Sequence, residues 1–150
     1  MSEKYIIGID QSTQGTKAII FSGEGKILGR SDRAHRQIID ERNYVEHDPV
    51  EIYNNTVSAV KEVITNAGVN PADIAGVGIS NQRETTVAWN RRTGEPVYNA
   101  IVWQCARAEQ LCRELNKNGF AEKVTDITGL NYSPYYAGPK MSWIIKNVPA

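Results

Sequence analysis

Residues 5–30 read YIIGIDQSTQGTKAIIFSGEGKILGR and contain three short strand-like runs separated by two turns. Residues 5–10 and 16–21 are rich in apolar residues and have strand length, and residues 26–30 can return as a third strand. The connections between them, QSTQG and SGEG, are only a few residues long. Strands joined by such short turns pair antiparallel, because a parallel pair needs a long crossover. This stretch therefore predicts an antiparallel meander.

A helix and a parallel strand are predicted to follow the meander. Asp48 is a favourable N-cap, Pro49 suits the first helical position, and Glu51 completes a capping box. Gly68 marks the end of the helix. Between these ends, apolar residues recur at helical spacing: Val50, Tyr53, Val57, Val60 and Ile64. Residues 74–80 then predict a buried strand, and a helix between two strands is the usual crossover of a parallel pair.

The second half of the chain continues without a linker or an internal repeat, which predicts one continuous domain. Cys105 and Cys112 fall in a segment predicted to be helical, about 10 Å apart along its axis. That separation is too long for a disulfide, so we expect two reduced thiols. The remaining elements follow from the same periodicities: strands at 85–89 and 97–102, and helices at 106–117 and 139–146.

Composition excludes several classes of partner. The 150 residues carry 17 basic and 17 acidic side chains, so no broad positive electrostatic field favours binding to nucleic acid or to an acidic membrane. No apolar run approaches the roughly 20 residues that span a bilayer. The polar residues at the amino terminus lead directly into the first strand without a secretory signal, so we expect a cytoplasmic protein.

The first turn has the chemistry of a phosphate-binding site. A meander followed by a crossover helix and a parallel strand resembles the opening of the ribonuclease-H-like fold of actin, hexokinase and sugar kinases, where the first hairpin approaches the phosphates of a nucleotide. Backbone N–H groups in such a turn can point at an anion. Thr13 and Thr16 add hydroxyls, Gly15 permits close approach, Lys17 supplies charge, and Asp10 can hold magnesium through water. The alternative is an ordinary hairpin, since the sequence contains no Walker loop or dinucleotide fingerprint.

A second group of polar residues follows the strand at 74–80, where the sheet reaches the surface. Arg83 can donate hydrogen bonds to the hydroxyls of a small polyol and Glu84 can accept them. Trp103 can cover the carbon face of such a substrate, and Tyr135 adds a hydroxyl. The alternative for Arg83 and Glu84 is a surface ion pair, which contributes little to stability.

Several motifs resemble the FGGY family of carbohydrate kinases, and within it the glycerol kinases. The main ones are ISNQRETT at 79–86 and TGEPVYNAIVWQC at 93–105. Shorter matches run in order through almost the whole chain: GIDQ at 8–11, VEHDP at 45–49, TGL at 128–130 and PY at 134–135. The resemblance implies an α/β, ribonuclease-H-like mixed sheet with flanking helices. It also implies that residues 1–150 form a truncated N-terminal domain, without the C-terminal nucleotide-binding domain.

The resemblance also assigns individual site residues to positions in this sequence. The resemblance makes Arg83, Glu84 and Tyr135 ligands of the glycerol hydroxyls, with Trp103 packing on the carbon chain. It places Asp10 near Mg²⁺, and four residues near the phosphates of ATP: Thr13, Gln14, Gly15 and Lys17. The sequence departs from the usual glycerol kinase pattern at Lys17 and Ala106, where arginine is common, and at Pro139, where threonine is usual. The turn at 12–17 is closer to the xylulose kinases, whereas Arg83 and Glu84 favour glycerol.

The resemblance implies an ATP-dependent kinase that phosphorylates a terminal hydroxyl of glycerol to give glycerol 3-phosphate. Two alternatives stay open: a xylulose kinase or other FGGY sugar kinase, and a non-catalytic sugar-binding or interaction module. The family's general base is an aspartate expected downstream of Ala150, so we expect no catalytic residue within this chain and no activity from it alone. The expected partner is a small polyol or sugar, and a homo-oligomer is left open for the full-length protein.

Overall fold

The computed structural model describes residues 3–149, and the chain divides into two compact units. The first comprises Met1–Arg36 and Val50–Gln82, and the second comprises Gln37–Pro49 and Arg83–Ala150. The expectation of one continuous domain, truncated at its carboxyl end, stays a prediction. Within residues 3–149, no helix combines the length and the apolar character needed to cross a bilayer.

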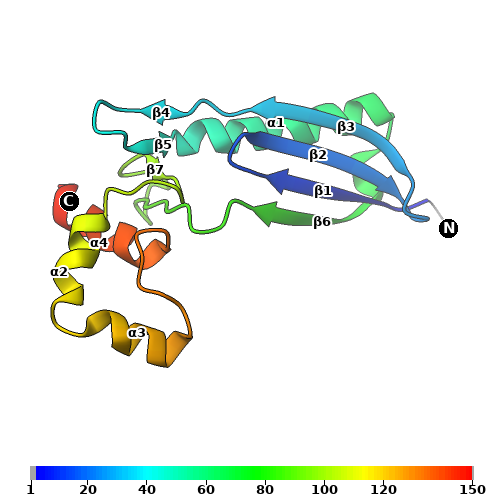
Figure 1. Cartoon of the computed structure of the whole chain (residues 1–150). Helices are drawn as coiled ribbons and strands as arrows, with labels where there is room; N and C mark the ends of the chain where they lie inside the picture. The colour runs from blue at the N-terminus through cyan, green and yellow to red at the C-terminus, as the bar shows by residue number, and fades with distance from the viewer. Residues whose placement is uncertain (1–2, 150) are drawn as a thin grey trace. The chain divides into compact units, whose positions relative to one another are not determined.

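The first unit contains a four-stranded mixed sheet with the order β3-β2-β1-β6 (Figure 1). Strands β1 (Tyr5–Gln11), β2 (Gly15–Ser22) and β3 (Ile27–Ala34) form the predicted antiparallel meander. Strand β6 (Ile74–Asn81) pairs parallel to β1, as predicted. The third strand runs four residues beyond the predicted end, because its pairing with β2 continues to Ala34.

Helix α1 (Pro49–Ala67) covers one face of this sheet, and the short 3-10 helix η1 (Pro71–Asp73) leads from it into β6. The helix is predicted correctly, and of its predicted apolar positions Val60 and Ile64 pack against the core, whereas the two nearest its start do not. Val50 and Tyr53 are 48% and 69% exposed. Val50 lies nine residues before the buried Ala59, which is two and a half turns and therefore the opposite side of the helix. The core of the unit contains Ile7, Ile9, Ala18, Ile20, Ala59 and Val63.

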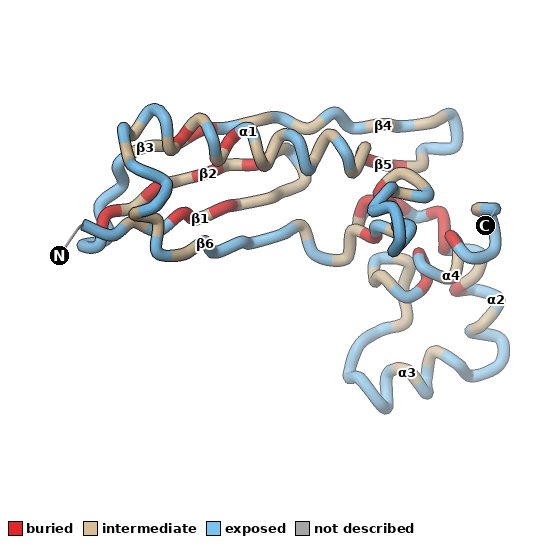
Figure 2. Tube along the Cα trace, turned by 180° about the vertical axis from the view of Figure 1, so that it is seen from behind, coloured by how far each residue is buried: buried red, intermediate tan, exposed pale blue. Residues whose placement is uncertain are grey.

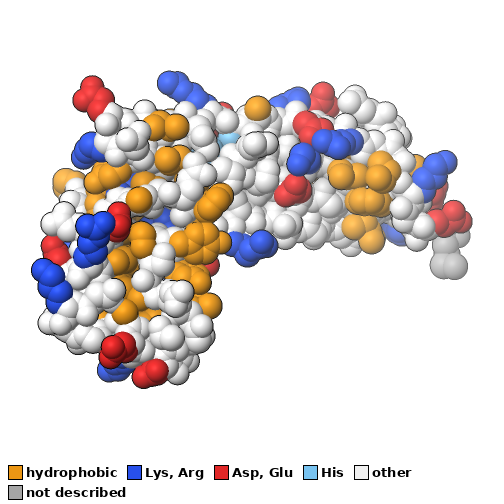
Figure 3. Space-filling view, in the orientation of Figure 1, with side chains coloured by type: hydrophobic (Ala, Val, Ile, Leu, Met, Phe, Trp, Pro, Cys, Tyr) orange, Lys and Arg blue, Asp and Glu red, His pale blue; other side chains and the backbone are white. Residues whose placement is uncertain are grey.

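Strand β6 is exposed, which corrects the prediction of a buried strand. It is the outermost strand of the sheet on the side of β1, and its apolar residues Val77 and Ile79 are 55% and 67% exposed. On β1, Ile6 alternates with the buried Ile7 and is 52% exposed. Hydrophobic side chains gather over the strands of this unit in the space-filling view (Figure 3). An apolar edge of this kind is typical of a sheet that another segment can extend.

The second unit combines a small antiparallel sheet with helices. Strands β4 (Ile38–Ile39), β5 (Val45–His47) and β7 (Ala100–Ile101) pair in that order. The helices are α2 (Glu109–Asn116), α3 (Phe120–Thr128) and α4 (Ala137–Asn147). Its core contains Val45, Ile101, Val102, Cys105 and Ile144. Figure 2 colours the buried parts of the chain red.

Several predictions for this unit were only partly correct. The strands expected at 85–89 and 97–102 reduce to β7 and to isolated bridges between Thr86 and Ile101 and between Trp89 and Pro96. Helix α2 begins three residues later than predicted, and Cys105 lies four residues before it. Both thiols are free, as expected. The final helix is confirmed, but α3 was not predicted. Helix α3 buries no residue, although Phe120, Val124 and Ile127 recur along it at helical spacing.

Arg107, two residues before α2, forms a buried ion pair with Glu46 of β5. Its side chain is 0% exposed, and Nη1 lies 2.7 Å from Oε1 of Glu46, which is 11% exposed. Glu46 also accepts hydrogen bonds from Tyr98 (2.8 Å) and Asn99 (2.7 Å). Burial alone would raise the pKa of Glu46, but the hydrogen bonds from Asn99, Tyr98 and Arg107 and the Arg107 charge hold this pKa below its ordinary value.

We expect Glu46→Gln to lower the free energy of unfolding at pH 7 by about 3–5 kcal/mol, because Arg107 loses its buried counter-charge. The pKa of Glu46 is lowered by folding, so the stabilisation is present above an unfolded-state pKa of about 4.3 and is lost as the pH falls through the folded value. Urea unfolding at pH 7 and at pH 3.5 measures the free energy of unfolding of wild type and variant. The difference between the two proteins should be smaller at pH 3.5.

A matched control is Glu109→Gln, which breaks the exposed pair between Arg113 and Glu109 on α2, 74% and 51% exposed. We expect it to change stability by less than about 0.5 kcal/mol. Equal effects of the two substitutions at pH 7 would contradict the structural role of the buried pair.

Candidate functional site

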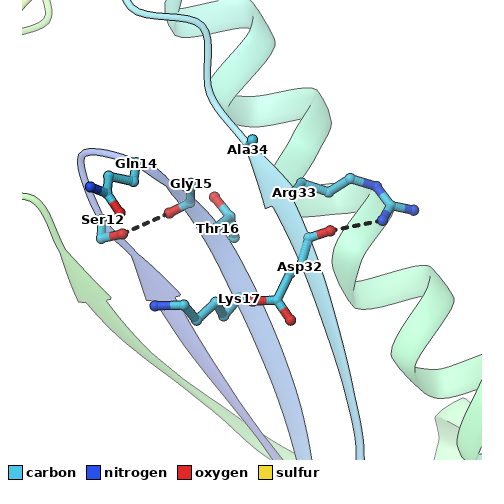
Figure 4. Close-up of a pocket in the computed structure, with 8 residues that line it drawn as sticks. All are labelled: Ser12, Gln14, Gly15, Thr16, Lys17, Asp32, Arg33 and Ala34. Carbon is cyan, nitrogen blue, oxygen red and sulfur yellow. Dashed lines mark hydrogen bonds between the residues drawn. The ribbon is translucent and has the colours of Figure 1, made fainter.

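The turn between β1 and β2 lines a cavity of about 190 Å³ in the first unit (Figure 4). The turn is closed by Ser12, whose N–H and Oγ both donate to the carbonyl oxygen of Gly15, at 2.9 and 3.0 Å. Of the predicted phosphate ligands, Gln14, Gly15 and Lys17 line this cavity. The other lining residues are Ser12, Thr16, Asp32, Arg33 and Ala34. Thr13 lies in the same turn but does not line the cavity.

Asp10 and Lys17 are cross-strand partners and form an ion pair of 3.2 Å. Both side chains are nearly half exposed, so the pair contributes little to stability. On its other side Lys17 is in register with Asp32 of β3, so the lysine lies between two acidic strand positions. Among the residues that the structure describes, no cluster of three or more acidic, cysteine or histidine side chains could hold a metal. Asp10 therefore fits magnesium only as a single carboxylate, with water and phosphate oxygens as further ligands.

Gly15 has a structural reason to be glycine. A Cβ atom at this position would lie 2.3 Å from the carbonyl oxygen of Arg33 and 3.2 Å from the Cα of Ala34. The absence of a side chain therefore lets β3 approach the start of β2. The sequence suggested that Gly15 permits close approach of an anion, whereas the close approach seen here is that of the neighbouring strand.

His35 supports the turn from behind and was not identified from the sequence. Its backbone N–H donates to the carbonyl oxygen of Gln14 at 3.0 Å. Its ring Nε2 lies 3.2 Å from Nε2 of Gln11 and 3.1 Å from Oγ1 of Thr16, and Nδ1 lies 3.1 Å from Nδ2 of Asn55. No local motif surrounds His35 in the sequence, and its partners come from three other elements. Only the folded structure reveals this network.

Three of the four predicted polyol ligands lie together in the second unit. Oε2 of Glu84 accepts a hydrogen bond of 2.7 Å from the N–H of Ala137, the first residue of α4. The ring of Tyr135, two residues earlier, packs edge-on against Trp103 with 5.9 Å between ring centroids. Glu84 has a left-handed backbone, with φ of 65°, which is unusual for a residue with a side chain and is typical of functional positions.

Arg83 is exposed and lies beside this cluster only through its peptide bond to Glu84. Within residues 3–149 its guanidinium forms no ion pair, with Glu84 or with any other carboxylate. The alternative of a surface ion pair between Arg83 and Glu84 is therefore wrong. The carboxylate of Glu84 instead accepts a hydrogen bond from the first residue of α4.

The amino-acid sequence matches a known family profile over nearly its whole length. The profile of the N-terminal domain of the FGGY carbohydrate kinases matches residues 5–150. The chain belongs to the FGGY family of carbohydrate kinases. The mixed α/β fold predicted from the resemblance agrees with solved FGGY structures.

The relatives of this FGGY chain include glycerol kinases. It is 48% identical over 145 residues to glycerol kinase of Thermoanaerobacter sp. (strain X514), covering 97% of this chain and 29% of that protein. The crystal structure of Plasmodium falciparum glycerol kinase with ADP matches with a TM-score of 0.88 and 35% identity, over 98% of this chain and 29% of that one. A ligand-bound xylulose kinase from Lactobacillus acidophilus matches with a TM-score of 0.82 and 25% identity, over 96% and 29% of the two chains. The FGGY chain thus spans about 29% of the length of these relatives.

We expect Gly15→Ala to destabilise the FGGY chain by about 1–3 kcal/mol, because the new methyl group overlaps the backbone of β3. Gly78→Ala on β6 is the matched control, since its Cβ would meet no atom within 4 Å. That variant should change stability by no more than about 0.5 kcal/mol. Urea unfolding of both variants measures the difference, and equal stabilities would rule out the packing role of Gly15.

Proposed function

We propose that this chain is the polyol-binding, amino-terminal part of an ATP-dependent glycerol kinase. The reaction is transfer of the γ-phosphoryl group of ATP to a terminal hydroxyl of glycerol, giving glycerol 3-phosphate. The observation that carries the proposal is the cluster of Glu84, Trp103 and Tyr135, in a chain 48% identical to a protein named glycerol kinase.

The cluster offers the groups that a small polyol needs. Oε2 of Glu84 is engaged by the N–H of Ala137, which leaves Oε1 to accept a hydrogen bond from a hydroxyl. Arg83 donates to neighbouring hydroxyls, and the exposed Tyr135 contributes its phenol group. The ring of Trp103 is partly exposed and packs against the carbon chain. Together these side chains recognise hydroxyls from both sides and leave the reacting hydroxyl oriented for in-line transfer.

The turn between β1 and β2 supports a role toward ATP. We assign Thr13, Gln14, Gly15 and Lys17 to the neighbourhood of the phosphates, where Lys17 supplies positive charge and the turn supplies N–H groups. Asp10 would hold Mg²⁺ through water, in competition with its ion pair to Lys17. Bound Mg²⁺ neutralises charge on the phosphates during transfer. The related Plasmodium falciparum glycerol kinase was solved with ADP, which agrees with a nucleotide site in this family.

The proposal places the general base, an aspartate, and the rest of the nucleotide site outside these 150 residues. Support comes from the lengths of the relatives, since the chain spans 29% of the Thermoanaerobacter protein. The exposed apolar residues Ile6, Val77 and Ile79 also support it, because they are suited to packing against further parts of a kinase. A self-contained sugar-binding module would leave this apolar surface in water. Cytoplasmic location and a homo-oligomeric state stay predictions.

Two experiments test the proposal at the level of activity. A chimera in which this chain replaces the matching segment of the Thermoanaerobacter enzyme should phosphorylate glycerol, whereas the 150-residue chain alone should show no turnover above background. A coupled assay of ADP release with glycerol and with xylulose measures both. A chimera that prefers xylulose would favour the xylulose kinase alternative, and a folded chimera without kinase activity would favour the non-catalytic module.

Single substitutions in the chimera should separate effects on glycerol from effects on ATP. Arg83→Met removes charged hydrogen bonds worth about 1.5–3 kcal/mol, so kcat/KM for glycerol should fall roughly tenfold to a hundredfold with little change in stability. Lys17→Ala should instead raise KM for ATP and leave KM for glycerol near the parent value. Arg91→Met, in the exposed turn at 90–94, is the control and should leave both constants unchanged. Equal kinetics for Arg83→Met and Arg91→Met would remove Arg83 from the polyol site.

A further inference from the structure

Lys140 is a fully buried lysine whose charge is surrounded by backbone oxygens. It is 0% exposed and ranks among the largest fully buried side chains of the described residues. Its Nζ donates hydrogen bonds to the carbonyl oxygens of Pro134 (2.7 Å), Tyr135 and Tyr136 (3.2 Å). An ammonium group has three donors, so all of them are used. The backbone before α4 therefore curls around a buried cation.

This arrangement orders the loop that carries Tyr135. Three consecutive carbonyl groups at 134–136 point at one atom, which leaves these peptide units little rotational freedom. The ring of Tyr135 then lies between Trp103, at 5.9 Å, and Tyr136, at 5.1 Å between centroids. The orientation of Tyr135 thus depends on the backbone that Lys140 holds.

Glu84 is connected to the same end of α4. Its carboxylate accepts the N–H of Ala137, directly after the three carbonyl groups that bind Lys140. Burial lowers the pKa of Lys140, and the negative charge of Glu84 opposes that shift. The negative charge of Glu84 therefore offsets part of the effect of burial on the charged form of Lys140.

We infer that Lys140 is a positioning residue for the polyol site: it holds Tyr135 and the start of α4, and through α4 it holds Glu84. The inference rests on the proposed function, because it assigns Lys140 to the organisation of the glycerol ligands. Lys140 touches no substrate in this role. It acts by presenting Glu84, Trp103 and Tyr135 in one preformed arrangement, which lowers the entropic cost of binding a small polyol.

The test is Lys140→Met in the glycerol kinase chimera, with Lys146→Met as the matched control. Lys146 is an exposed lysine in the last turn of the same helix. We expect Lys140→Met to lower kcat/KM for glycerol about tenfold to a hundredfold, because small displacements of binding groups have effects of this size. KM for ATP should stay within about twofold of the parent, and Lys146→Met should change neither constant. Equal losses toward glycerol and ATP, or parent-like glycerol kinetics, would overturn the inference.

A second variant covers the case in which Lys140→Met does not fold. Lys140→Arg keeps the positive charge, but its planar guanidinium cannot reproduce the three contacts of the ammonium. A rise in KM for glycerol of several-fold, at unchanged KM for ATP, supports the positioning role, and unchanged glycerol kinetics contradict it.

A readout without catalysis separates this inference from the proposed function. In the 150-residue chain, the amide signals of Tyr136 and Ala137 in NMR spectra should shift or broaden in the Lys140 variants and not in Lys146→Met. Unchanged amide signals would overturn the ordering role of Lys140. Inactivity of the parent chimera would instead contradict the proposed function.

Discussion

A cation that is removed from water must be surrounded by acceptors, and this constraint organises the second unit of the chain. Arg107 and Lys140 are both buried, at 6% and 0% exposure. Arg107 is compensated by Glu46 of β5, and Lys140 by three carbonyl groups before α4. Arg107 thereby connects two segments that are far apart in the sequence, whereas the acceptors of Lys140 lie only four to six residues before it. The candidate polyol ligands lie next to the second of these centres.

The candidate polyol site shows how one group can serve structure and binding together. One oxygen of Glu84 accepts a hydrogen bond from the N–H of Ala137 at the start of α4. Unpaired N–H groups and the helix dipole favour a carboxylate at this end of a helix. The other oxygen remains for a ligand. Under the proposed function, a polyol hydroxyl would meet an acceptor whose position is already fixed by the contact with Ala137. Glu84 adopts a left-handed backbone conformation in this position, which is energetically unfavourable for a residue with a side chain.

The turn between β1 and β2 is likewise shaped by local contacts, but by weaker ones. Its shape depends on Ser12 bonding to Gly15, on His35 behind it, and on the close contact between Gly15 and β3. Lys17 forms an ion pair with Asp10 at the surface. Because this pair is exposed, an anion can displace it at a small cost in free energy.

The sequence by itself determined the meander, the crossover helix and the parallel strand β6, because these elements depend on local periodicity and turn chemistry. It also determined the family, through motifs spread along the chain. Only the tertiary structure decided that β6 is exposed, that Val50 lies on the outer side of α1, and that Glu84 contacts Ala137 instead of Arg83. It also revealed the partners of His35 on β1, β2 and α1, and the three nearby carbonyl groups that bind the buried Lys140. Burial and the choice of a hydrogen-bond partner depend on which distant segments meet, and a linear pattern does not contain that information.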